Sequence, residues 1–212
     1  AKVLPVDLDS LADGQGASIV RRTVQDTVDG KMAANFELRV VRVGSYLTPE
    51  VRFIYVDNGG TGQVVSVRGD PVARAAHRLQ VASSPLDPYP SEGLTHLAAS
   101  FNTVTAELKL YIDGVMQASD KRPELSRPPQ SGQGARSFVR AGEGFKGFID
   151  DIRIWSVVRS ESEIYNNIEE LDTTEANLVV AYTQDDGGWP ATPVKASVLQ
   201  TLAAPPAGEP NT

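Results

Sequence analysis

Apolar and polar residues alternate along this chain in short runs, most clearly between residues 106 and 114. There, single polar or amphipathic residues separate Leu108, Leu110 and Ile112. A period of two is typical of a strand with one buried face. Asp113-Gly114 follows as a tight-turn signal, and the apolar run at 94–101 lies just upstream, joined by the segment NTVT. We therefore predict a pair of neighbouring strands over this part of the chain.

Similar strand-like runs recur between turn signals rich in glycine, proline, asparagine and aspartate. They lie at residues 35–43, 51–57, 63–69, 76–83, 137–142, 147–155 and 177–183. One helix is expected, because Ser160 and Glu163 form a capping box, and it would run to about Glu170. No stretch approaches the roughly 18 consecutive apolar residues of a membrane-spanning helix. The pattern predicts an all-β protein with one short helix toward its C-terminal part.

The composition favours one folded domain. The chain has 212 residues, of which 41% are hydrophobic, enough for a sizeable core. We expect the domain to span residues 1–190, and residues 191–212, which end in AAPPAGEPNT, to be an extended segment or linker. The start, AKVLPVDLDS, carries no signal peptide, so we expect a module cut from a longer protein.

Charge and cysteine content exclude several classes of function. The net charge is −7 and the pI is about 4.9, and no run of lysine and arginine stands out. We therefore expect no nucleic-acid partner and no anionic membrane surface as a ligand. Cysteine is absent, which excludes disulfides, thiolate metal sites and cysteine nucleophiles.

Three segments resemble the laminin-G-like and pentraxin-like jelly rolls of the concanavalin A-like superfamily. They are LTHLAASFNTVTAELKLYIDGVMQAS, FKGFIDDIRIWSVVRSESEI and EANLVVAYTQDDGG, in the order expected of that group over roughly residues 94–188. The resemblance implies an antiparallel jelly-roll β-sandwich. It further implies an extracellular or cell-surface setting and, usually, a role as a binding module.

Two adjacent carboxylates, Asp150 and Asp151, interrupt an apolar run and are the candidate metal ligands. With a period of two they fall on opposite faces of one central strand over 147–155. A buried carboxylate is costly unless it is paired or hydrogen-bonded. Three partners could satisfy them: backbone N–H groups, an arginine such as Arg153, or a bound Ca²⁺. The ion-paired or hydrogen-bonded alternative is favoured, and calcium remains open as a cofactor.

An acidic segment offers the alternative of catalysis. Glu170, Asp172 and Glu175 fit the spacing E-x-D-x-x-E, which resembles the catalytic strand of jelly-roll glycosidases. In the resembled domains this position is a surface turn, so a solvated acidic turn is favoured.

Two further motifs carry weaker signals. Residues 142–147 fit G-x-G-x-x-G, but a strand follows where a phosphate-binding loop needs a helix. His96 matches a structural strand histidine of the resembled domains, and His77 carries no readable signal. We predict no catalytic residues.

Aromatic side chains are the candidate ligand contacts. Trp189 follows two glycines, and Tyr55 and Tyr89 are further candidates for stacking on a ligand. The loops 57–62, 84–93 and 120–136 could form a binding rim, because the sheet core does not depend on them.

These observations predict a non-catalytic recognition or adhesion module of a larger secreted or cell-surface protein. It would bind a glycan or a protein partner through rim loops or the concave sheet, and would adjoin neighbouring domains of a parent chain. The alternatives are a structural domain in a larger assembly and a polysaccharide hydrolase on the same fold.

Overall fold

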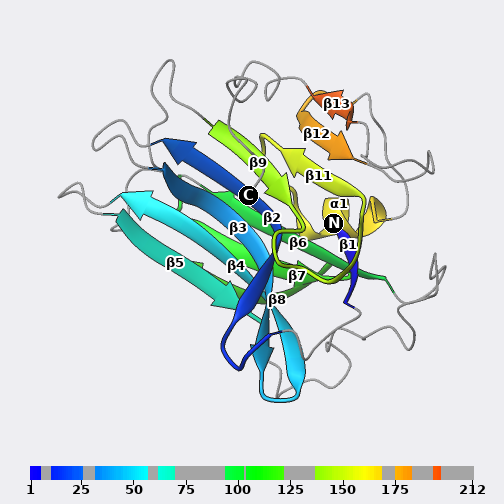
Figure 1. Ribbon diagram of the computed structural model, residues 1–212. Helices are drawn as coiled ribbons and strands as arrows, with labels where there is room; N and C mark the ends of the chain where they lie inside the picture. Colours follow the sequence, from blue (N-terminus) through cyan, green and yellow to red (C-terminus); the bar gives the residue numbers. More distant parts are fainter. Residues whose placement is uncertain are drawn as a thin grey trace, which may run out of the picture.

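The computed structural model describes residues 1–5, 11–25, 32–56, 62–69, 94–102, 104–121, 137–168, 175–182 and 193–196. Its elements are almost all strands, as expected (Figure 1). They are, in order, β1 (Lys2–Pro5), β2 (Gly16–Gln25), β3 (Met32–Val43), β4 (Tyr46–Val56), β5 (Gly62–Arg68), β6 (Thr95–Asn102), β7 (Glu107–Ile112), β8 (Val115–Lys121), β9 (Ser137–Ala141), β10 (Gly147–Asp150), β11 (Ile152–Trp155), α1 (Glu161–Asn166), β12 (Leu178–Tyr182) and β13 (Pro193–Ala196).

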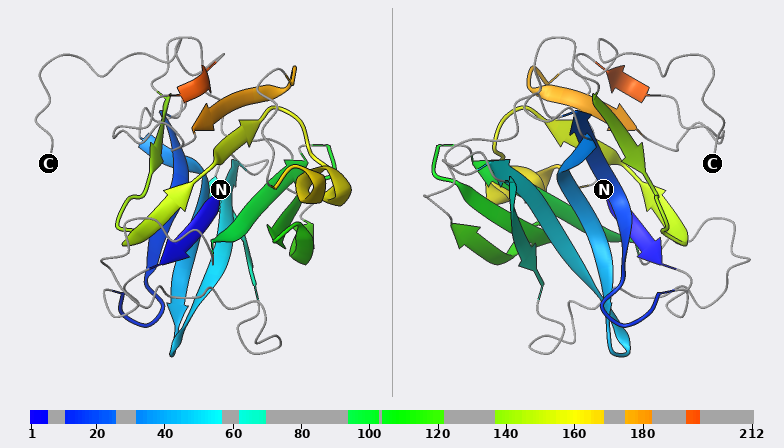
Figure 2. Two further views of the ribbon diagram at one scale, coloured as in Figure 1. Left: turned by 90° about the vertical axis from the view of Figure 1, so that its right-hand side faces the viewer. Right: turned by 60° about the vertical axis from the view of Figure 1, so that its left-hand side comes forward.

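Two five-stranded antiparallel sheets form the sandwich. One has the order β5-β4-β3-β2-β9 and the other β10-β1-β6-β7-β8, and a three-stranded sheet β11-β12-β13 adjoins them. Figure 2 shows β2–β5 and β6–β8 as two facing layers, with α1 beside the second. The chain passes repeatedly from one sheet to the other, as in a jelly roll. This confirms the predicted antiparallel sandwich with one short helix among the described residues.

The core lies between the two layers. Both five-stranded sheets contribute fully buried aliphatic side chains, among them Ile19, Val40, Leu97 and Leu110. Phe53 of β4 stacks on a phenylalanine of β6, with ring centroids 3.8 Å apart. The two sheets are therefore held together by continuous apolar contact, the largest source of stability in such a fold.

The strand pair predicted over 94–114 is confirmed. β6 and β7 pair in antiparallel register, and the turn between β7 and β8 uses Asp113 (φ 48°) and Gly114 (φ 79°). Helix α1 packs directly on this turn, since a Cβ on Gly114 would lie 2.8 Å from the Cα of Tyr165. The backbone N–H of Met116 on the edge strand β8 donates to the carboxylate of Glu161, 2.9 Å away.

The single strand predicted over 147–155 is wrong, because it breaks at Asp151. That residue has φ 51°, a left-handed conformation outside the β region of regular strands. β10, before the break, pairs with β1, whereas β11, after it, pairs with β12 in another sheet. The assignment of Asp150 and Asp151 to opposite faces of one strand is therefore also wrong. Aspartate tolerates this conformation better than most residues, which explains its place at the crossing.

The capping box of the helix is confirmed. The Glu163 backbone N–H donates to the Ser160 hydroxyl, and the Ser160 backbone N–H donates to the Glu163 carboxylate. These bonds to Ser160 lower the pKa of Glu163. The helix is shorter than predicted and ends at Asn166.

Four strands were not anticipated as strands. One is β8, which pairs with β7 and extends into the loop expected at 120–136. β1 is short and inserts between β10 and β6, while β2 lies in a stretch that gave no clear signal. β13 lies beyond residue 190 and pairs with β12. The predicted strand at 76–83 falls outside the described residues.

Candidate functional site

The face of β2–β5 that points away from the core is built from charged and hydroxyl side chains. In β3 and β4 the residues alternate between the two faces, so Leu38 pairs with Val51 in the core and Arg39 pairs with Glu50 outside it. We call this outward surface the polar face. It comprises Ser18, Arg21, Thr23, Glu37, Arg39, Thr48, Glu50, Arg52 and Arg68, with Arg140 of β9 and Glu143 at its border.

Glu50 lies at the centre of the polar face. Its side chain is only 6% exposed, and Arg39 from β3 and Arg68 from β5 both form ion pairs with it. The Arg68 contact measures 3.1 Å. A buried carboxylate needs such partners to offset its desolvation, and here two cations share one anion.

Glu37 lies on β3 two residues before Arg39, on the same side of the sheet. The Ser18 hydroxyl donates to it at 2.6 Å, and Arg52 of β4 lies 3.7 Å away. The Arg52 side chain is 38% exposed and that of Arg68 is 41% exposed, whereas the two glutamates are nearly covered. The polar face therefore has a buried floor and accessible guanidinium groups at its rim.

The β9 side of the polar face repeats the arrangement. Glu143 forms ion pairs with Arg21 at 2.7 Å and with Arg140 at 3.6 Å. The Arg140 guanidinium also lies over the Phe138 ring, 4.7 Å from its centroid. Again two arginines share one glutamate.

Two hydroxyl groups of the polar face lack a hydrogen-bond partner. They belong to Thr23 and Thr48, which are 8% and 2% exposed. An unpartnered buried hydroxyl costs about 1–3 kcal/mol.

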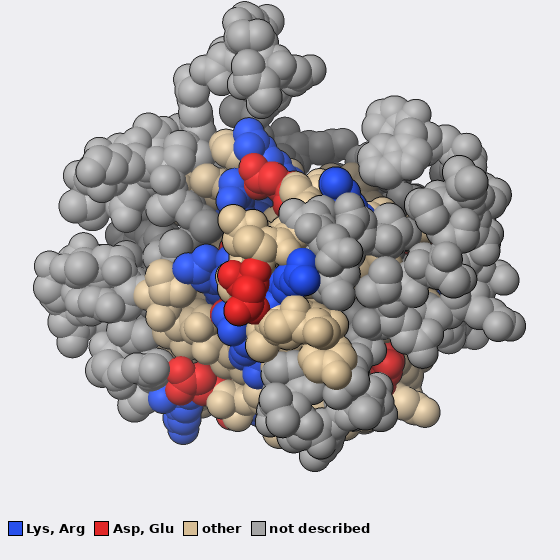
Figure 3. Space-filling view, turned by 60° about the horizontal axis from the view of Figure 1, so that its bottom comes forward, with Lys and Arg blue, Asp and Glu red and all other residues tan. Residues whose placement is uncertain are grey.

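Figure 3 shows the charge pattern on the lower side of the molecule, where basic and acidic side chains lie interleaved rather than in separate fields.

The predicted metal ligands are engaged by the protein itself. The Asp151 carboxylate forms ion pairs with Lys2 at 3.2 Å and with Arg153 at 3.3 Å. Asp150 accepts a hydrogen bond from the Asp151 backbone N–H at 2.7 Å. Two cations at one carboxylate do not fit a Ca²⁺ site, which needs several oxygen ligands. Within the described part of the chain, no group of three or more histidine, aspartate or glutamate side chains could hold a metal.

His96 is a buried residue of β6. Burial, and then the positive charges of the Ala1 amino group, Arg153 and Lys2, lower its pKa to about 3. Its backbone N–H donates to the Asp113 carboxylate at 2.9 Å, and its Nδ1 lacks a partner. A neutral imidazole in this setting is a structural residue of the sheet.

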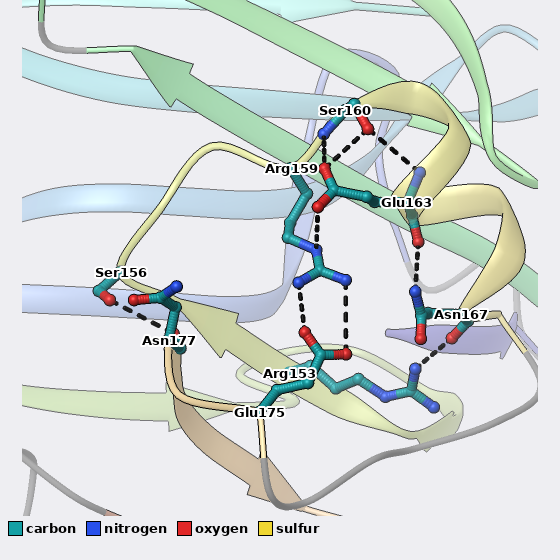
Figure 4. A network of polar contacts seen from close by, with 8 residues as sticks. All are labelled: Arg153, Ser156, Arg159, Ser160, Glu163, Asn167, Glu175 and Asn177. Atoms are coloured by element: carbon teal, nitrogen blue, oxygen red, sulfur yellow. Dashed lines mark hydrogen bonds and ion pairs between the residues drawn. The ribbon is translucent and has the colours of Figure 1, made fainter.

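Glu175 belongs to a polar network that ties α1 to the segment before β12 (Figure 4). Its carboxylate accepts hydrogen bonds from both terminal nitrogens of Arg159. The Arg159 guanidinium also lies over the Trp155 ring, 4.2 Å from the centroid. Ser156 donates to the Asn177 carbonyl in the same network. Glu175 precedes β12 instead of lying in a strand.

The other acids of the catalytic alternative, Glu170 and Asp172, lie outside the described residues. Glu175 is therefore the one member of that motif that the structure places, and its partner is an arginine of the same chain.

The predicted aromatic contacts fall largely beyond the described positions. Trp189 and Tyr89 are not among them, nor are most of the loops 57–62, 84–93 and 120–136. The backbone of Tyr55 lies in β4 opposite Gln63.

The polar face was missed at the level of sequence, although a signal was present. Glu37 and Arg39 alternate with apolar residues in one run, and Glu50 and Arg52 do so in another. Period-two charges on neighbouring strands predict cross-strand ion pairs, but only the register shows which residues meet.

Among the described residues, no helix is long and apolar enough to cross a membrane.

Comparison with known proteins gives the family. No curated protein matches the sequence. One similar solved structure is that of a candidate carbohydrate binding protein from Bacteroides ovatus, with 16% identity and a TM-score of 0.46, covering 87% of this chain. This chain spans about half of that protein (49%).

The sequence profile of a laminin G family within the concanavalin A-like lectin/glucanases superfamily matches residues 20–165. This range includes β3, β4, β5 and β9, most of β2, and the capped start of α1. The chain therefore belongs to the concanavalin A-like lectin/glucanases superfamily.

Proposed function

We propose that this chain is a non-catalytic glycan-binding module of a secreted or cell-surface protein, and that the polar face is its binding surface. Membership of a superfamily of lectins and glucanases supports a carbohydrate ligand. The fold alone does not determine function, so the location and chemistry of the site rest on the polar face.

The observation that carries the proposal is the combination of a buried polar floor with accessible guanidinium groups on one sheet. Among the described residues, Arg52 and Arg68 each contact a glutamate through one terminal nitrogen. A guanidinium group has five N–H donors, so most donors of these two side chains are not used by their contacts with Glu37 and Glu50. Sugar hydroxyls and ring oxygens accept such hydrogen bonds.

A binding role is favoured over hydrolysis by the position of Glu175. Glycosidases use two carboxylates that flank the scissile bond, several ångströms apart, in a cleft. Glu175 is instead held by Arg159 and lies close to α1. Its carboxylate serves to fix the helix against the segment before β12.

The test is binding of the purified chain to a panel of immobilised polysaccharides, followed by isothermal titration with the glycan that binds best. We expect Arg68→Ala to weaken that binding about tenfold or more, the equivalent of one hydrogen bond from a charged donor. Lys109→Ala is the matched control. It removes the same charge from β7 in the opposite sheet, where Lys109 pairs with Glu107 at 3.2 Å.

Equal losses in both variants would place the site elsewhere. Binding to none of the glycans would contradict a carbohydrate ligand and favour a structural domain in a larger assembly. Release of reducing ends from a bound glycan would contradict the non-catalytic role.

A further inference from the structure

The polar face has an excess of positive charge on a negatively charged chain. With its border it holds five arginines and three glutamates, so two positive charges are in surplus, whereas the whole chain has a net charge of −7. The arginines are Arg21, Arg39, Arg52, Arg68 and Arg140. Such a positively charged patch attracts anions and repels other positively charged surfaces.

The arginines are also arranged in a way that suits carboxylates. Glu50 is shared by Arg39 and Arg68, and Glu143 is shared by Arg21 and Arg140. Planar guanidinium groups match the geometry of a carboxylate and bind it through paired hydrogen bonds. Each of these clusters retains one uncompensated positive charge after its glutamate is counted.

The two clusters lie at different positions across the sheet. Glu50 is on β4 and Glu143 follows β9, three strands away in the order β5-β4-β3-β2-β9. At about 4.8 Å between neighbouring strands, they are separated by about 14 Å. An extended polymer with repeated negative charges can contact both clusters, whereas a single small anion can contact one.

We propose that the glycan bound at the polar face is an acidic polysaccharide whose charges are the carboxylates of uronic acids. This inference rests on the proposed glycan-binding function and specifies its ligand class. The partly exposed guanidinium groups of Arg52 and Arg68 bind carboxylates along the polymer, and those of Arg21 and Arg140 bind a second stretch of it.

The experiment compares polygalacturonate with its fully methyl-esterified form, which has the same backbone without the charges. We expect polygalacturonate to bind at least tenfold more tightly at 50 mM NaCl, and its affinity to fall when NaCl is raised to 200 mM because the exposed charges are screened. The double variant Arg52→Ala/Arg68→Ala should lose this preference, whereas Lys109→Ala should retain it.

Poly-L-glutamate serves as a polyanion without sugar rings. Binding of poly-L-glutamate as tight as that of polygalacturonate would overturn the inference, because charge alone would then explain the interaction. Equal or tighter binding of the esterified polymer would also overturn it, while leaving the proposed function intact. If neither polymer and no neutral glycan bound, the proposed function would fail as well.

Discussion

Replacing Gly114 by alanine tests how α1 is fixed on the sandwich. The added Cβ would lie 2.8 Å from both Cα and Cβ of Tyr165, which is closer than Cβ atoms in proteins approach non-bonded neighbours. Helix α1 cannot easily move away, because Glu161 accepts a hydrogen bond from Met116 on β8 and Arg159, just before the helix, forms an ion pair with Glu175. The strain must therefore appear as a loss of stability.

Gly44→Ala is the matched control. Gly44 also has a positive φ, 58° against 79° at Gly114, but a Cβ there would meet nothing within 4 Å. Left-handed alanine costs about 1–2 kcal/mol, and the stiffer unfolded chain offsets about 0.4–1 kcal/mol. Gly44→Ala should therefore destabilise by about 1 kcal/mol.

Gly114→Ala carries the additional cost of overpacking, about 1–3 kcal/mol. We expect it to destabilise by about 2 kcal/mol more than Gly44→Ala, which lowers the unfolding midpoint by a further 4–8 °C or so in a chain of this size. Urea unfolding followed by far-ultraviolet circular dichroism measures the free energy directly. Equal losses in the two variants would refute the close packing of α1 on the β7–β8 turn.

Three further predictions concern ionisable groups. His96 has a pKa of about 3 when folded and about 6.5 when unfolded, so only the unfolded state takes up its proton as the pH falls through this window. Stability should fall by about 1.4 kcal/mol per pH unit below pH 6.5, and a His96→Gln variant with the same slope between pH 6.5 and 5 would contradict this. Asp151→Asn removes the anion shared by Lys2 and Arg153, all largely buried, and should lower the free energy of unfolding by about 3 kcal/mol. An unchanged urea midpoint would argue against these ion pairs. Thermal midpoints in EDTA and in millimolar CaCl₂ should coincide, and a rise of several degrees with CaCl₂ would restore a calcium site at Asp150 or elsewhere.

The fold could be predicted from sequence where apolar alternation was regular. The strand that contains Leu108 and Leu110 follows the period of two. The capping box of Ser160 and Glu163 predicts the start of the helix from neighbouring residues alone. The break at Asp151 was not predictable in this way. Its left-handed backbone depends on the two strands it joins pairing in different sheets, which is a long-range property.

The candidate site shows the same division. The alternating charges of β3 and β4 are visible in the sequence, but the pairing of Glu50 with Arg68 depends on the register between β4 and β5. The pairing of Glu143 with Arg21 joins segments more than a hundred residues apart. Net charge could not indicate a local excess of arginine, because the whole chain is acidic.

The most direct measurement is an NMR titration of the arginine side-chain Nε–Hε resonances with a short oligogalacturonate. Binding at the polar face should shift the signals of Arg52 and Arg68, and those of Arg21 and Arg140 with longer oligomers. Arg159, held by Glu175 beside α1, is the internal reference and should not move. Shifts at Arg159 alone, or none at any arginine, would contradict glycan binding at the polar face.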